Sequence, residues 1–102
     1  MKLAIVYARE IAGENVYEQV DACRAFAQAN DLVPTATVID LVMDGPAYRL
    51  GLRGALDMVK AGDIPVLVAM SQVHVSKDAV RFASLQETLA ELNCTVMFVQ
   101  SE

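Results

Sequence analysis

The run Leu3-Ala4-Ile5-Val6-Tyr7-Ala8 is apolar throughout and ends at Arg9-Glu10. An uninterrupted apolar run of this length is typical of a strand that is buried on both faces, as in parallel sheets. Strand-like stretches follow over residues 32–40, 64–70 and 94–100, and helical patterns separate them. Alternation of strand and helix predicts an α/β fold with a mainly parallel sheet, built through right-handed crossovers.

Apolar residues at helical spacing predict three helices, over residues 16–29, 50–61 and 78–92. Asn15 and Glu18 have the spacing of a capping box at the start of the first helix. We expect Gly62 to end the second helix in the left-handed conformation, and Asn93 to end the third. Pro34 lacks a backbone N–H group, so the second strand is expected at an edge of the sheet.

The composition is that of one packed domain. The chain has 102 residues, of which 55% are hydrophobic and 21% are charged, with only five glycines and three prolines. Such an apolar content excludes disordered and collagen-like chains. We therefore expect a single domain over residues 1–102, because domains usually have about 100 to 150 residues.

The charge balance and the short apolar runs limit the expected partners. The formal net charge is -5, whereas broad binding to nucleic-acid phosphates depends mainly on lysine and arginine. We expect weak or no direct DNA binding by the chain alone. No apolar run approaches the ~20 residues that span a bilayer, and Met1-Lys2-Leu3 leads directly into the first strand. A cytoplasmic protein without membrane contact is the expectation.

The two cysteines, Cys23 and Cys94, lie far apart in a predicted helix and strand, and the chain has one histidine. This pattern supports neither a disulfide scaffold nor a zinc site, so both are expected to be core residues and no cofactor or metal is expected. In folds of this class, functional groups gather in loops at the carboxyl ends of the strands. Those loops are predicted at 9–15, 41–49 and 71–77.

Motifs in and around these three loops occur together in one known family. They are Tyr7-Ala8-Arg9-Glu10-Ile11 with the helix segment 18–27, Asp44-Gly45 with Arg49-Leu50-Gly51-Leu52 and the segment 60–64, and Val73-His74-Val75-Ser76-Lys77-Asp78. Together they resemble the catalytic domain of the serine recombinases, the resolvase and invertase family. The resemblance covers the whole chain and implies a three-layer domain with a four-stranded sheet between helices. It also implies truncation after the fourth strand, without the family's DNA-binding domain.

The resemblance assigns roles to particular residues. In that family a serine hydroxyl attacks a DNA phosphodiester, and arginines stabilise the developing charge on the phosphate. The serine position is occupied here by Ile11, which has no oxygen. The other degenerate positions are Val73 in place of an aspartate and His74 and Lys77 in place of two arginines, whereas Arg9, Gln19, Arg49 and Ser76 match the family. A domain without catalytic activity is therefore predicted.

Several of these residues have simpler interpretations. Arg9 and Arg49 are candidates for a phosphate or anion site, or surface arginines paired with Glu10 and Asp44. His74 is interpreted as a loop histidine without a special role. Ser76 is expected to form a local turn or a cap for the helix that begins near residue 78.

Three functional hypotheses remain open at the level of the sequence. The first is an inactive recombinase-like domain that acts as an interaction or regulatory module, as a homodimer or with a recombinase-like partner. The second is a retained strand-exchange role in a larger assembly with an active partner. The third is a flavodoxin-like domain that binds a small anion or a nucleotide. The first draws on an apolar surface expected on the third helix, from Val80, Phe82, Leu85, Leu89 and Leu92.

Overall fold

Four parallel strands form one sheet in the order β2-β1-β3-β4 in the computed structural model, which describes residues 2–41 and 50–100. The strands are β1 (Lys2–Arg9), β2 (Leu32–Asp40), β3 (Val66–Ala69) and β4 (Thr95–Phe98). The helices are α1 (Val16–Ala29), α3 (Leu50–Gly62), α4 (Gln72–Val75) and α5 (Ala79–Glu91). The predicted α/β class and parallel sheet are confirmed.

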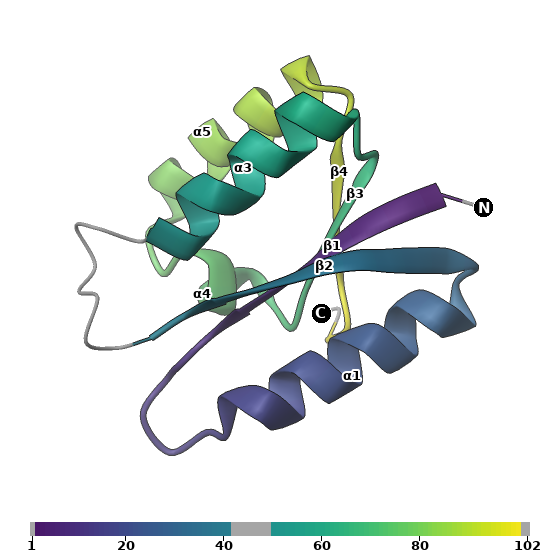
Figure 1. Cartoon of the computed structure of the whole chain (residues 1–102). Helices are drawn as coiled ribbons and strands as arrows, with labels where there is room; N and C mark the ends of the chain where they lie inside the picture. Colours follow the sequence, from purple (N-terminus) through teal and green to yellow (C-terminus); the bar gives the residue numbers. More distant parts are fainter. Residues whose placement is uncertain (1, 42–49, 101–102) are drawn as a thin grey trace.

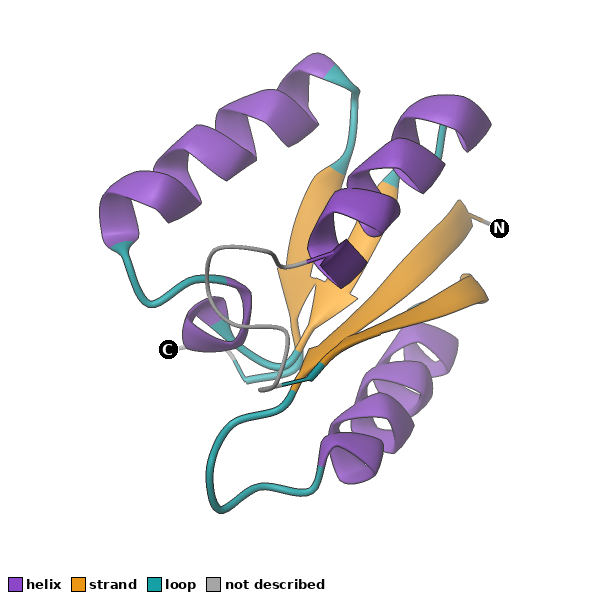
Figure 2. Ribbon diagram, turned by 60° about the vertical axis from the view of Figure 1, so that its left-hand side comes forward, coloured by secondary structure: helices purple, strands orange, loops and turns teal. Residues whose placement is uncertain are grey.

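Helices cover both faces of the sheet, so the domain has three layers (Figures 1 and 2). Along β1, Ile5 and Tyr7 pack into the cluster beneath α3 and α5, whereas Ala4 and Val6 pack into the cluster beneath α1. All four side chains are fully buried. This two-sided burial explains the apolar run from Ala4 to Ala8, whereas Leu3 at the start of β1 is 43% exposed.

Strand β2 is an edge strand, as Pro34 predicted. It pairs with β1 alone, and the register shifts between the pairs Ala4–Pro34 and Ile5–Ala36. Thr35 is therefore an extra residue opposite an uninterrupted β1, which is the pattern of a β-bulge.

The helix ends match the predictions at two positions and differ at a third. The side chain of Asn15 caps α1 as predicted, by accepting a hydrogen bond from the Tyr17 N–H at 2.9 Å. The Glu18 N–H donates to the backbone carbonyl of Asn15, so only the cap residue of the predicted capping box is confirmed. Asn93 takes the left-handed conformation after α5, with φ of 58°. The prediction for Gly62 is wrong, because Gly62 is the last residue of α3 and Asp63 carries the positive φ of 49°. The helix is one residue longer than the glycine rule implied.

The predicted loop 71–77 contains a helical turn, α4, in which the Ser76 N–H donates to the Gln72 carbonyl at 2.8 Å. The strands β3 and β4 are shorter than the predicted stretches 64–70 and 94–100. Some apolar surface remains exposed on the third helix, as expected, and it is centred on one residue. Phe82, Leu85, Leu89 and Leu92 pack against the core, and Val80 is the exposed one, at 78%.

Neither a membrane span nor a metal cluster occurs within residues 2–41 and 50–100. No helix there is both long and apolar enough to cross a bilayer. No group of three or more histidine, cysteine or acidic side chains gathers in a geometry that would hold a metal ion. Cys23 and Cys94 are buried free thiols, and burial raises the pKa of each to about 11.

Candidate functional site

The end of β1 is held by a side chain of α1. Gln19 is buried, and its amide pairs with the backbone of Arg9 in both directions. The Arg9 N–H donates to Oε1 at 3.1 Å, and Nε2 donates to the Arg9 carbonyl at 2.7 Å. These two bonds fix where β1 stops and therefore where the loop that contains Ile11 begins. The resemblance marked Gln19 as a matching position, and this geometry gives a physical reason for an amide there.

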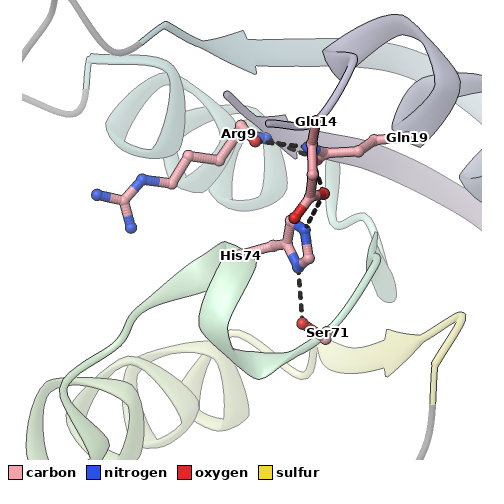
Figure 3. A network of polar contacts seen from close by, with 5 residues as sticks. All are labelled: Arg9, Glu14, Gln19, Ser71 and His74. Atoms are coloured by element: carbon pink, nitrogen blue, oxygen red, sulfur yellow. Dashed lines mark hydrogen bonds and ion pairs between the residues drawn. The ribbon is translucent and has the colours of Figure 1, made fainter. Parts of the chain in front are cut away.

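A second group of polar contacts joins the loop after β1 to α4 (Figure 3). The Nε2 of His74 lies 2.8 Å from Oε1 of Glu14, and its Nδ1 lies 2.6 Å from Oγ of Ser71. The amide of Gln19 also approaches Oε1 of Glu14, at 3.4 Å. The interpretation of His74 as a loop residue is wrong, because it lies within α4 and is 5% exposed.

The guanidinium of Arg9 points away from this polar group, as Figure 3 shows. It lines a separate cavity of about 390 Å³ between the start of α3 and the start of α5. Lys77 and Arg81 line the same cavity and bring two more positive charges to it. The carboxylate of Asp78, also in the lining, accepts hydrogen bonds from the Val80 and Arg81 N–H groups and caps α5.

A buried carboxylate organises the start of α3. Asp40 is 3% exposed, and its Oδ2 accepts from the Tyr7 hydroxyl at 2.6 Å and from the Leu52 N–H at 3.0 Å. Its Oδ1 accepts from the Gly51 N–H at 2.6 Å. Negative charge at a helix N-terminus is favourable, because the first N–H groups have no partner within the helix. Asp40 thus ties β1, β2 and α3 together at the carboxyl edge of the sheet.

The remaining predicted site residues are scattered. Ile11 is partly buried in the loop after β1, where its carbonyl accepts from the Glu14 N–H at 3.0 Å. Val73 is 49% exposed on α4. The hydroxyl of Ser76 donates to the carbonyl of Asp78 and accepts from its N–H, which confirms the predicted local turn. Arg49 lies outside the described residues.

Sequence reasoning did not connect Glu14 or Ser71 with His74. Glu14 lies 60 residues from His74 along the chain, and no periodic pattern relates two loops at such a separation. Ser71 and His74 are three residues apart, the spacing that brings side chains together on a helical turn. That signal required α4 to be recognised as a helix.

No protein-family model matches the sequence, and no curated protein matches it. Solved structures do match its fold. The catalytic domain of ISC1926 TnpA, an IS607-like serine recombinase, has a TM-score of 0.85 at 17% identity, over 98% of this chain and 69% of that chain. The catalytic domain of TP901-1 integrase has a TM-score of 0.86 at 15% identity, over 96% of this chain and 77% of that chain.

A resolvase family site-specific recombinase from Streptococcus pneumoniae is similar to the same degree. Its TM-score is 0.84 at 17% identity, and the match covers 97% of this chain and 72% of that chain. Identities this low establish the fold, whereas function depends on the residues at the site. This chain has the fold of the serine recombinase catalytic domains.

Proposed function

We propose that this chain is a serine-recombinase-type domain that no longer cleaves DNA and that acts by binding another protein. The observation that carries this proposal is Ile11, which stands where the resemblance places the nucleophilic serine. A hydrocarbon side chain cannot form the phosphoserine bond on which that chemistry depends.

The surroundings of His74 support the loss of DNA cleavage. The resemblance places a phosphate-binding arginine at this position, but both ring nitrogens of His74 bond within the protein, to Ser71 and Glu14. The imidazole is therefore not presented to a phosphate. Val73 also supplies no carboxylate at the neighbouring position. The residues at positions 73 and 74 thus support, together with Ile11, the loss of DNA cleavage.

The partner that we propose is a second copy of the chain, with a recombinase-like protein as the other possibility. Apolar side chains are exposed at several places on the described surface, including Val80 on α5 and Val73 on α4. Light scattering on the purified chain at high concentration is expected to give the mass of a dimer. A monomer at every concentration would contradict self-association.

A DNA-cleavage assay tests the loss of activity. Purified chain is incubated with supercoiled DNA that carries candidate crossover sites, and a denaturing gel is read for a covalent protein–DNA adduct. The wild type is expected to give none. Ile11→Ser runs beside it, and an adduct from that variant alone would show that the nucleophile is the missing part. An adduct from the wild type would overturn the proposal. The proposal would also be overturned if the chain added DNA-cleavage activity to a mixture with an active recombinase and the Arg9→Ala variant of the chain did not.

A second candidate function is anion binding, favoured by three cations that line the Arg9 cavity against one carboxylate, Asp78, which lies 3.9 Å from Arg81. Inorganic phosphate is expected to raise the melting temperature of the wild type, because a ligand that binds only the folded state stabilises it. Lys77→Ala should abolish that rise. The matched control is Arg24→Ala, on the exposed face of α1, where the guanidinium bonds to Thr37. An unchanged wild-type melting temperature would contradict anion binding.

A further inference from the structure

The hydrogen-bond roles in the Ser71, His74 and Glu14 group follow from their chemistry. An ionised carboxylate can only accept, so the Nε2 of His74 must carry the hydrogen that bonds to Glu14. A neutral imidazole with its proton on Nε2 has a lone pair on Nδ1. The contact of 2.6 Å between Nδ1 and Ser71 Oγ is then a bond in which the serine hydroxyl donates to the ring.

The order of these groups is hydroxyl, imidazole and carboxylate, as in nucleophilic serine sites on unrelated folds. The two ring nitrogens have exchanged roles relative to that template, in which the hydroxyl contacts Nε2 and the carboxylate contacts Nδ1. Here the hydroxyl contacts Nδ1 and the carboxylate contacts Nε2. Either nitrogen of a neutral imidazole can take a proton, so the reversed ring keeps the chemistry of a general base. Recognition of such a site depends on geometry and roles, not on sequence position.

The group also borders a space that would admit a substrate. A cavity of about 670 Å³ is lined by Glu14, Ser71, Gln72, Val73, His74, Phe98 and Gln100. Ser71 is partly exposed, whereas the side chain of His74 is 6% exposed. The hydroxyl is therefore reachable and the base is shielded from water. The ring of Phe98 packs against Phe82, with the centroids 5.8 Å apart, and supplies an apolar wall.

We propose that Ser71 is a nucleophile toward small carboxylic esters, with His74 as its general base and Glu14 as a positioning residue. In the first step Ser71 Oγ forms a bond to the acyl carbon and its proton passes to Nδ1 of His74. The bond from that carbon to the alcohol oxygen then breaks, and the departing oxygen takes the proton. Water repeats the sequence on the acyl-serine, which releases the carboxylic acid and restores the hydroxyl. This activity is separate from the proposed function.

The test uses the full chain without DNA, so its failure leaves the recombinase-like proposal untouched. A fluorophosphonate probe is incubated with the protein, and the labelled residue is identified by peptide mass spectrometry. Hydrolysis of p-nitrophenyl acetate is followed in parallel. We expect label at Ser71 and at least a tenfold higher kcat/KM for the wild type than for Ser71→Ala. Ser84→Ala, an exposed serine on α5, should behave as the wild type.

Variants of Glu14 separate a positioning role from a structural one. Glu14→Ala should lower kcat about tenfold or more with little change in KM, since the ring loses its orientation. Glu14→Gln should recover part of that loss, because its amide oxygen can still accept from Nε2. Circular dichroism confirms that each variant is folded. Absence of label at Ser71, or equal hydrolysis by the wild type and Ser71→Ala, would overturn the nucleophile. If the Glu14 variants had the same kcat as the wild type, the positioning role of Glu14 would be overturned.

Discussion

Replacing Gly51 by alanine tests how the start of α3 is built. An added Cβ at this position would lie 2.6 Å from Oδ1 of Asp40 and 3.0 Å from a methyl carbon of Val38. The contact with Asp40 is closer than real Cβ atoms make, and the contact with Val38 is tighter than most of them, so the carboxylate must move. Asp40 caps α3 and accepts a buried hydrogen bond from the Tyr7 hydroxyl, so a displacement of its carboxylate would weaken both interactions.

The expected loss of stability follows from these parts. Removing a helix cap costs about 0.5–2 kcal/mol, and weakening a buried hydrogen bond costs about 1–3 kcal/mol. The higher helix propensity of alanine relative to glycine offsets up to about 1 kcal/mol of this loss. We expect Gly51→Ala to be less stable by about 2 kcal/mol, which corresponds to a melting temperature about 8–16 °C lower for a domain of this size.

Urea unfolding followed by far-ultraviolet circular dichroism measures this difference. Gly54→Ala is the matched control in the same helix, because nothing lies within 4 Å of its added Cβ. That variant should gain about 0.5–1 kcal/mol, the ordinary effect of replacing glycine inside a helix. If Gly51→Ala were as stable as the wild type, the close approach of Asp40 would not constrain this position and the reasoning would be refuted.

Three further predictions concern the core and the thiols. Tyr7→Phe should lower the free energy of unfolding by about 1–3 kcal/mol, because the buried Asp40 loses a donor; an unchanged urea midpoint would contradict this. Leu89→Ala should lower the free energy of unfolding by about 2–5 kcal/mol, because it removes a buried side chain. Val80→Ala, at an exposed position, should change the free energy of unfolding by no more than about 0.5 kcal/mol. Equal changes of the two variants in thermal melts would contradict the burial of Leu89. At pH 8 the thiols of Cys23 and Cys94 should react with iodoacetamide about 100-fold more slowly in the folded chain than in urea, since burial raises each pKa from 9.0 to about 11. The raised thiol pKa values also contribute to the stability of the fold, and this contribution is complete below pH 9 and is lost as the pH rises from 9 to 11. The urea midpoint should therefore fall over that pH range, and the fall should be smaller in Cys23→Ala, which lacks one of the two thiols.

The fold was predictable because burial leaves a regular mark on the sequence. β1 lies between two layers and is apolar from Leu3 to Ala8, and Pro34 marked β2 as an edge through its missing backbone donor. The end of α3 was harder to place. Gly62 and Asp63 are adjacent, and an aspartate can adopt the left-handed conformation when the turn requires it, so residue type alone gave the wrong position.

The candidate site was predictable only in part. The resemblance placed Arg9, Lys77 and Ser76 in neighbouring loops, and all three line one cavity. The contact between Glu14 and His74 depends on the exact path of two loops without periodicity, so it required the structure. Which apolar residues of the third helix stay exposed could not be predicted, because helical spacing identifies one apolar face without showing what that face contacts. Leu89 and Phe82 contact the core.

The proline and the bulge in β2 also restrict how copies of this chain can meet. A strand at the border of a sheet offers its backbone to any other strand, which is a common route to aggregation. In β2 the backbone of Pro34 has no hydrogen to offer, and the extra Thr35 interrupts the regular repeat that an incoming strand must match. The opposite border, β4, has four residues. Neither border presents a long uniform ladder, so association of two copies through side chains is favoured over continuous sheets that run from one molecule into the next.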